Sequence, residues 1–239
     1  MFLRQKERRA RKLDIVVYRH NLADLTVTQF QTLLQDLASD PSIDGVWVER
    51  PLPEHLRHLD ERIYDWIPYQ KDPEGLHPRY RALLYSGVRP TILPPTAAAV
   101  MYALRRSGIS LESRRALVIG RSLLVGRPIF HLLLIANATP TVAHSRSRDL
   151  PRLVAEAEVL VVAVGQPRLV HGEWIREGAY VVDVGTNVVN GQLVGDVDPA
   201  AGERAAWITP VPGGIGPLTS VLAVANVLRL RELLAFPIA

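Results

Sequence analysis

The chain has 239 residues, of which 48% are apolar, carries a formal net charge of +4 and contains no cysteine. This composition is sufficient for one large domain or two smaller ones, and the lack of cysteine excludes a disulfide scaffold, cysteine-ligated zinc and a thiol nucleophile. The N-terminus is charged from Arg4 onward and no apolar run is long enough to span a bilayer, so we expect a cytosolic protein with no signal peptide and no membrane partner.

The basic charge is concentrated at the start of the chain. Residues 1–12 hold six basic side chains and one acidic one, an excess larger than the net charge of the whole chain. A nucleic-acid-binding protein usually spreads its basic residues over one face of the fold, so we expect no nucleic-acid partner. This segment is either a solvent-exposed helix face or a site that attracts an anionic ligand.

Short β-branched runs alternate with helical patterns, which predicts an α/β fold with a mostly parallel sheet. Several runs are almost entirely apolar, as expected for strands that are covered by helices on both faces. The predicted strands are Ile15–Tyr18, Ile43–Val48, Ala116–Ile119, Thr141–His144, Val159–Val164, Tyr180–Val184 and Trp207–Thr209.

Helical patterns fill the intervals between these runs. Thr28 is the expected cap of a helix whose apolar stripe includes Phe30, Leu33, Leu34 and Leu37. Further helices are predicted at Ala97–Arg106 (ended by Gly108), from Asp149 onward, and at Gly216–Leu234.

A domain boundary is expected in Ser86–Pro95, which is rich in glycine and proline and lacks periodicity. We expect a first lobe at residues 1–97 and a second at residues 98–217. The last helix, within residues 218–239, has an apolar face that is expected to pack back on the first lobe.

The second lobe begins with a dinucleotide-binding pattern. The predicted strand at Ala116–Ile119 runs directly into residues 120–128, Gly-Arg-Ser-Leu-Leu-Val-Gly-Arg-Pro, and then into an apolar helix. Backbone N–H groups and the helix dipole can face a phosphate at such a turn. Ser122 occupies the second position of the common Gly-x-Gly-x-x-Gly pattern, so an ordinary strand-to-helix turn is the alternative.

The charges near this turn favour NADP over NAD. Arg121 lies in the turn, and Ser145 and Arg146 follow the next predicted strand. An NAD site usually has an acidic residue there for the ribose diol, whereas guanidinium and hydroxyl groups suit a 2′-phosphate.

Six stretches resemble the bifunctional methylenetetrahydrofolate dehydrogenase/methenyltetrahydrofolate cyclohydrolase family, in that family's order and spacing. They cover nearly the whole chain, and the last of them, which reads Ile-Thr-Pro-Val-Pro-Gly-Gly-Ile-Gly-Pro-Leu-Thr, is highly specific. The stretches are residues 43–53, 71–78, 118–128, 179–187, 193–197 and 208–219.

The resemblance implies two α/β lobes: a first lobe that binds folate and is shortened here, and a second, Rossmann-like lobe that binds NADP. It also implies a homodimer. The implied reactions are NADP-dependent oxidation of 5,10-methylenetetrahydrofolate and hydrolysis of the resulting methenyl compound to 10-formyltetrahydrofolate.

The resemblance also places site residues. The catalytic positions fall at Lys6, which would shuttle protons during the hydrolysis, at Glu49, and at Glu74, the family's pterin-binding position. The substrate-binding positions fall at Phe2, Pro212, Gly213 and Gly214, and the cofactor-binding positions at Gly120, Arg121, Ser122, Ser145 and Thr186. No metal site is implied.

Four differences separate this sequence from the family pattern. The family's tyrosine is replaced by Phe2, which removes a hydroxyl donor. The glutamine before the family's Leu-Pro-Leu-Pro turn is replaced by Glu49. The pterin-binding aspartate is replaced by Glu74. The Pro-Cys-Thr-Pro-x-Gly turn reads Pro-Pro-Thr-Ala-Ala-Ala at residues 94–99.

Glu49 has the clearest chemical consequence. A carboxylate beside Lys6 would favour its ammonium form, whereas a proton shuttle near neutral pH needs an amine that can release its proton. Hydride transfer asks little of protein groups beyond positioning. We therefore expect dehydrogenase activity to survive better than cyclohydrolase activity.

The chain also starts late relative to the family. Family members carry roughly fifty further residues before the lysine, a helix and a strand whose absence would leave a sheet edge and apolar surface uncovered.

Two other functions are compatible with these differences. One is a non-catalytic homologue that binds NADP or a partner, and the other is an NADP dehydrogenase that has changed its substrate. His55 and His58 share one helical face but lack a third ligand, so zinc is disfavoured. His77 and His144 lie inside family motifs and are expected to serve turn structure and not chemistry.

Overall fold

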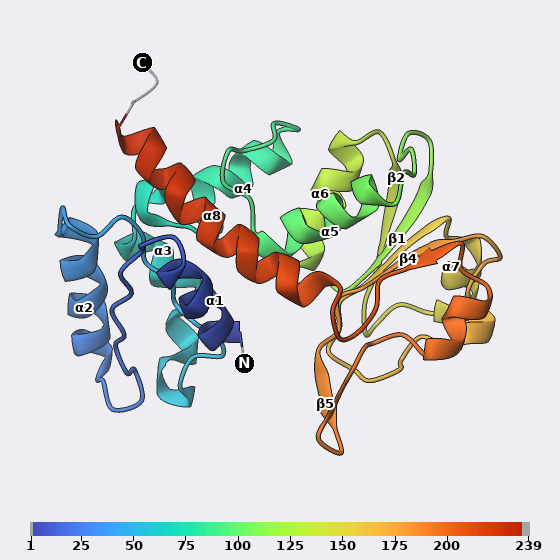
Figure 1. Ribbon diagram of the computed structural model, residues 1–239, viewed down its shortest axis with the longest axis horizontal. Coiled ribbons are helices and arrows are strands. Elements are labelled where there is room, and N and C mark those ends of the chain that lie inside the picture. Colours follow the sequence, from blue (N-terminus) through green and yellow to red (C-terminus); the bar gives the residue numbers. More distant parts are fainter. Residues whose placement is uncertain (1, 236–239) are drawn as a thin grey trace. The chain divides into compact units, whose positions relative to one another are not determined.

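The computed structural model describes the backbone of residues 2–235 and the side chains of residues 3–233 (Figure 1). Contacts divide the chain into two units. Unit 1 comprises Met1–Leu83, Pro90–Pro95 and Ser220–Ala239, and unit 2 comprises Leu84–Arg89 and Thr96–Thr219. No helix within residues 2–235 is long and apolar enough to cross a membrane.

The helices are α1 (Phe2–Arg11), α2 (Val27–Ser39), α3 (Ile63–Trp66), α4 (Pro78–Tyr85), α5 (Pro95–Arg106), α6 (Gly126–Ile135), α7 (Leu150–Glu156) and α8 (Ile215–Ala235). Short 3₁₀ helices are η1 (Glu54–Arg62), η2 (Tyr69–Lys71), η3 (Gly172–Trp174) and η4 (Pro199–Glu203). The strands are β1 (Arg115–Ile119), β2 (Thr139–Ala143), β3 (Val159–Val162), β4 (Tyr180–Asp183), β5 (Asn187–Val189), β6 (Gln192–Val194) and β7 (Trp207–Ile208).

Unit 2 is built on a parallel sheet with the strand order β2-β1-β3-β4-β7. The connection through α6 moves from β1 to β2, and the connection through α7 moves back past β1 to β3. Right-handed crossovers in opposite directions place their helices on opposite faces, as Figure 1 shows for α6 and α7. The central strands are therefore buried on both sides, and all four residues of β3 are buried.

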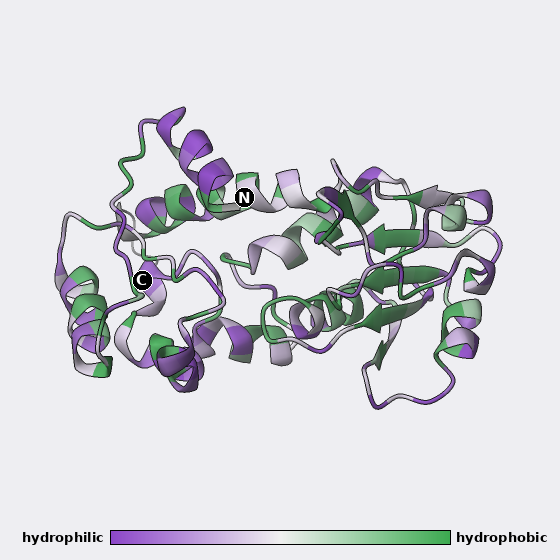
Figure 2. Ribbon diagram, turned by 90° about the horizontal axis from the view of Figure 1, so that it is seen from below, coloured by the Kyte–Doolittle hydropathy of each residue, from purple (hydrophilic) through white to green (hydrophobic). Residues whose placement is uncertain are grey.

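The sequence prediction for this sheet is confirmed. All five strands predicted in unit 2 are present, and each lies within two residues of its expected bounds. Figure 2 shows these strands among the most apolar parts of the unit. The β5–β6 hairpin was not predicted, although Asn190 and Gly191 at its turn, with φ angles of 50° and 77°, are typical of a tight two-residue hairpin.

The cap of α2 lies two residues earlier than predicted, at Thr26 instead of Thr28. The Thr26 hydroxyl accepts from the Gln29 N–H at 3.2 Å, and the Gln29 side chain accepts from the Thr26 N–H at 2.9 Å. Because the glutamine lies three residues after Thr26, this pair satisfies two free N–H groups of the first turn at once. The expected stripe is confirmed, with Phe30 and Leu34 buried.

The two strands predicted in unit 1 were wrong: among the described residues, Ile15–Tyr18 and Ile43–Val48 carry no strand pairing. Their side chains still alternate between more and less exposed positions, as they would in a strand. A strand also requires a hydrogen-bonded neighbour, and neither segment has one. The sequence therefore predicted the local pattern correctly but not the pairing.

Candidate active site

The amine of Lys6 contacts the carboxylate of Glu49. Lys6 lies in the middle of α1, and its Nζ is 2.5 Å from Glu49 Oε1 and 5.5 Å from the centroid of the Trp47 ring. The Lys6 side chain is 12% exposed and that of Glu49 is 40% exposed. The structure thus brings together two of the three predicted catalytic residues, in an ion pair that remains open to solvent on the Glu49 side.

The third predicted catalytic residue, Glu74, is held by two other side chains. Its Oε2 accepts from Arg50 Nη1 at 2.8 Å and from the Tyr64 hydroxyl at 3.1 Å. Arg50 also donates to Asp60 at 2.8 Å. The Oε1 atom of Glu74 makes no hydrogen bond to any described residue. One carboxylate oxygen is therefore fixed and the other is available to a ligand.

Burial and charge act in opposite directions on Arg50. Burial alone would lower the pKa of its guanidinium, but the combined effects of Glu74, Tyr64 and Asp60 outweigh burial and raise the pKa. Burial raises the pKa of Tyr64, and Glu74 raises it further. The guanidinium consequently stays charged and the phenol stays a donor, so the hold on Glu74 persists across the working pH range.

The turn that carries Glu74 is organised by Asp72. This carboxylate is fully buried and accepts from the backbone N–H groups of Glu74 at 2.9 Å, Leu76 at 2.7 Å and His77 at 2.7 Å. Burial raises the pKa of Asp72 to about 6, because its effect exceeds the opposing effect of these hydrogen bonds. Asn226 of α8 donates to the Pro73 carbonyl at 2.8 Å and so ties the turn to that helix.

In unit 2, the turn after β1 has two positions that accept glycine alone. A Cβ on Gly120, whose φ is 125°, would collide with the Ala163 carbonyl, and one on Gly126 would collide with the Gly120 carbonyl. The Ser122 hydroxyl accepts from the N–H of Val125 at 3.2 Å and therefore stabilises the turn itself. Such a close backbone turn at the start of α6 fits the phosphates of a dinucleotide.

Arg121, Ser145 and Thr186 are all exposed, and each follows the carboxyl end of a strand of the sheet. Arg121 comes after β1, Ser145 after β2 and Thr186 after β4. Their side chains make no hydrogen bond or ion pair with described residues. Ligands of open α/β sheets bind beyond the carboxyl ends of the strands, so these groups are free to contact one.

Two buried aspartates shape the loops beyond β3 and β4. Asp183 accepts from the backbone N–H groups of Gly185 at 2.8 Å and Asp196 at 3.0 Å. Asp196 accepts from Val164 at 2.7 Å and Gly165 at 2.9 Å. Burial raises the pKa of Asp183, although its backbone hydrogen bonds oppose this. Both carboxylates hold loops in place and are not exposed to a ligand.

The remaining predicted positions are in a loop of unit 2 or outside the described side chains. Pro212 and Gly213 are exposed and Gly214 is partly exposed, in the loop between β7 and α8, where the Gly214 N–H donates to the Pro210 carbonyl at 2.9 Å. Phe2 begins α1, but its side chain lies outside the described part of the structure. Within residues 2–235, no group of three His, Asp or Glu side chains could hold a metal ion.

Sequence reasoning missed Arg50 and Asp72 as parts of the site. Arg50 replaces the first leucine of the family's Leu-Pro-Leu-Pro turn. A charged residue at an otherwise apolar position of the motif could have indicated a role in the site. Asp72 gave a weaker signal, because an aspartate before a Pro-Glu-Gly turn is common in loops of any function.

Comparison with known proteins agrees with this arrangement. A family model described as tetrahydrofolate dehydrogenase/cyclohydrolase, NAD(P)-binding domain, matches residues 94–234. The bifunctional protein FolD of Thermus thermophilus is 42% identical over 235 residues, which cover 95% of this chain and 80% of that protein. The bifunctional protein FolD of Sorangium cellulosum is 45% identical over 232 residues, covering 96% and 80%.

A solved structure resembles the whole fold. The Trypanosoma brucei N5,N10-methylenetetrahydrofolate dehydrogenase-cyclohydrolase, complexed with NADP cofactor and inhibitor, has 35% sequence identity and a TM-score of 0.92. The similarity covers 98% of this chain and 82% of that one.

Proposed function

This chain belongs to the tetrahydrofolate dehydrogenase/cyclohydrolase family, and we propose that it oxidises 5,10-methylenetetrahydrofolate with NADP and hydrolyses the 5,10-methenyl product to 10-formyltetrahydrofolate. The observation that carries the proposal is the extent of the match, which takes in 95% of the chain and therefore both units. A homologue that had kept only a dinucleotide-binding lobe would match over unit 2 alone.

We assign the cofactor to unit 2, the expected NADP lobe at residues 98–217. The turn at Gly120–Gly126 is closed tightly on its own backbone and leads into α6, whose first N–H groups can face a phosphate. Arg121 and Ser145 are exposed and offer donors to a 2′-phosphate, and Thr186 adds a hydroxyl on the same edge of the sheet. Bound NADP supplies the hydride acceptor of the first reaction.

We assign folate chemistry to unit 1, the expected folate lobe at residues 1–97 with the helix at 218–239. The free Oε1 of Glu74 can accept an N–H of the pterin ring while Arg50 fixes its other oxygen. The family resemblance adds Phe2 and the Pro212–Gly214 loop as substrate contacts. These groups hold the one-carbon unit in place, which is most of what hydride transfer requires of them.

The hydrolysis, unlike hydride transfer, requires Lys6 to transfer protons. Water adds to the methenyl carbon, a proton leaves that water, and one carbon–nitrogen bond of the ring then breaks with a proton going to nitrogen. An amine that takes and returns a proton assists both steps. In this chain the Lys6 amine is engaged by Glu49 at 2.5 Å, which supports a cyclohydrolase step that is slower than the dehydrogenase step.

The two activities can be assayed separately on one preparation. NADPH formation from methylenetetrahydrofolate measures the first step, and loss of methenyltetrahydrofolate absorbance measures the second. Lys6→Met should lower the second rate by about 100-fold or more while the first largely persists. Lys12→Met, which changes an exposed lysine just beyond α1, is the matched control. Binding of NADP with neither reaction in the unmodified protein would favour a non-catalytic homologue.

The family resemblance also supports a homodimer and a cytoplasmic location. Light scattering on purified protein tests the dimer, which should have about twice the 26.5 kDa mass of the chain. Fractionation of cells that produce the protein tests the location, and recovery in the membrane fraction would overturn it.

A further inference from the structure

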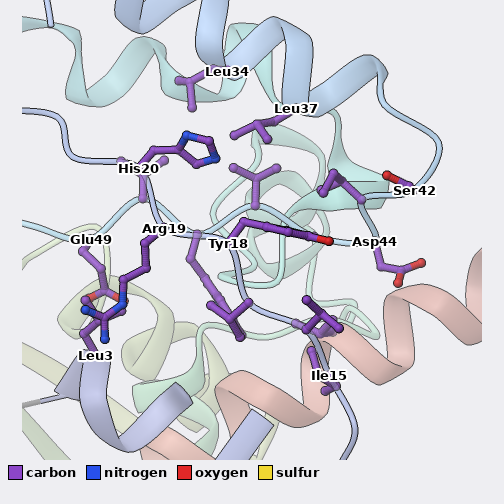
Figure 3. Close-up of a pocket in the computed structure, with 18 of the residues that line it drawn as sticks. Leu3, Ile15, Tyr18, Arg19, His20, Leu34, Leu37, Ser42, Asp44 and Glu49 are labelled. Carbon is purple, nitrogen blue, oxygen red and sulfur yellow. The ribbon is translucent and has the colours of Figure 1, made fainter. Parts of the chain in front are cut away.

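Unit 1 contains a cavity of about 530 Å³ that is lined mainly by apolar side chains and includes Glu49, of the proposed catalytic pair, at its border. It is lined on one side by α2, through Leu33, Leu34 and Leu37, and on the other by α8, through Val227 and Leu228. Figure 3 shows Leu34 and Leu37 pointing from α2 toward the cavity, with Tyr18 near the middle of the view and Ile15 near α8. Both flanks are therefore helices that present aliphatic side chains.

Two non-helical segments, residues 15–20 and 42–49, also line this cavity, and no hydrogen bond between described residues joins them. The main-chain groups of residues 16–20 make no hydrogen bond within the described structure. In residues 44–49, the engaged main-chain groups are the Val46 N–H, which donates to Lys71 at 2.9 Å, and the Val48 carbonyl, which accepts from Arg50 at 3.0 Å. Most peptide groups along both segments are free.

We name this space the strand slot: the cavity between α2 and α8 together with residues 15–20 and 42–49. Helices on two sides, with strand-like segments between them, form the layers of an α/β sandwich whose middle layer has a gap. Val16 is 72% exposed and Tyr18 is 69% exposed, although both belong to an apolar run. The indole N–H of Trp47, which also lines the slot, is buried without an acceptor among the described residues.

The chemistry of the slot selects its occupant. The aliphatic flanks would accept any apolar molecule. A lipid or an aromatic compound, however, would form no hydrogen bonds with the free N–H and C=O groups along the edges. An extended peptide satisfies both requirements, because its backbone pairs with each edge and its alternating side chains enter the two flanks.

We propose that the strand slot binds an extended apolar peptide, which inserts as a β-strand between residues 15–20 and 42–49. The apolar segments of residues 2–235 are already committed to helices, to the sheet of unit 2 or to the edges of the slot.

A fluorescein-labelled peptide of about eight residues, with valine at the inner positions and a lysine at each end, is a suitable probe. Fluorescence anisotropy with the full chain should show saturable binding with one peptide per chain. Hydrogen exchange at residues 16–20 and 44–49 should slow when the peptide is bound. The same peptide with N-methyl groups on alternate amides keeps its side chains but loses donors, and it should bind at least tenfold more weakly.

Surface variants locate the site. Tyr18→Asp and Val16→Asp change residues that are already exposed, so the fold should tolerate them, and each should weaken peptide binding at least tenfold. Val188→Asp is the matched control, because Val188 is 69% exposed on β5 in unit 2 and should leave binding unchanged.

Three results would overturn the proposal: no saturable binding, equal binding of the methylated peptide, or self-association of the chain that protects the same amides without peptide. Each measurement is independent of the enzyme assays, so loss of folate turnover would not affect the conclusion.

Discussion

Arg50 and Glu74 are each 14% exposed and are joined by a 2.8 Å hydrogen bond that fixes one carboxylate oxygen and leaves the other unbonded. In the family pattern these positions carry leucine and aspartate. A larger acid and a cation have thus appeared together, and the longer glutamate side chain ends on the guanidinium. We interpret them as one coupled change that keeps a single carboxylate oxygen available for the pterin.

If the two residues are coupled in this way, Arg50→Leu alone should lower stability and weaken folate binding, because it leaves the Glu74 carboxylate buried without its cation. We expect a loss of about 2–4 kcal/mol in the free energy of unfolding and a raised KM for folate. Adding Glu74→Asp should recover part of both, with a coupling of about 1 kcal/mol or more in a double-mutant cycle.

Urea unfolding and steady-state kinetics measure these two quantities. Arg62→Leu is the matched control, since Arg62 is 63% exposed in its pair with Asp65 and should change stability by less than about 0.5 kcal/mol. Strictly additive effects of Arg50→Leu and Glu74→Asp would show that the two residues are not coupled.

Glu49→Gln should raise the cyclohydrolase rate. The substitution restores the family's neutral residue and removes the carboxylate from the Lys6 amine, so that the amine no longer has to leave an ion pair before it exchanges a proton. We expect an increase of about threefold to tenfold. The dehydrogenase rate should change by less than about twofold because positioning is retained.

Decay of methenyltetrahydrofolate absorbance follows the first effect and NADPH formation the second. Glu54→Gln removes an exposed carboxylate nearby in sequence and should alter neither rate. A cyclohydrolase rate that stays unchanged or falls in Glu49→Gln would mean that the ion pair does not limit proton transfer.

Arg121→Ala should weaken NADP binding by about tenfold to 100-fold while changing NAD binding little. The exposed guanidinium follows β1 and is expected to meet the 2′-phosphate, which NAD lacks. Calorimetric titration with each dinucleotide measures the ratio. Arg106→Ala, at the end of α5 before the amino end of β1, should leave both affinities unchanged. An equal loss for NAD and NADP would assign Arg121 to the shared pyrophosphate instead.

The parts of the fold that could be predicted from sequence are those in which one segment carries the information. The run at Val159–Val162 is apolar throughout because it is covered on both faces, and this pattern does not depend on the order of its neighbours. The segments at 15–18 and 43–48 have an equally strand-like pattern, but strand formation also requires a partner. Pairing depends on the rest of the chain and cannot be read from either segment.

The same distinction applies to the site. Gly120 could be predicted from the sequence because a glycine turn between a strand and a helix is a local pattern. The effect of Glu49 on Lys6 could be stated only as a condition, since 43 residues separate the two in sequence. The contact between Arg50 and Glu74 spans 24 residues and was not foreseen.

The buried carboxyl of Asp72 predicts a pH dependence of stability. Its pKa is raised to about 6 in the folded protein, whereas an aspartate in the unfolded chain titrates near 3.9. The folded state therefore favours the protonated form. The stability that Asp72 contributes is fully present below about pH 4 and is lost as the pH rises through about 6.

Asp72→Asn makes this position neutral at every pH and weakens the hydrogen bonds to the turn at Glu74–His77. Unfolding in urea should show that the variant is less stable than the original protein at pH 5. The difference in free energy of unfolding between the two proteins should be about 1–2 kcal/mol larger at pH 5 than at pH 7.5. Asp65→Asn, at a side chain that is 58% exposed, should show the same small difference at both pH values. A difference for Asp72→Asn that grows as the pH rises would mean that the carboxylate is stabilised by its three backbone donors more than it is destabilised by burial.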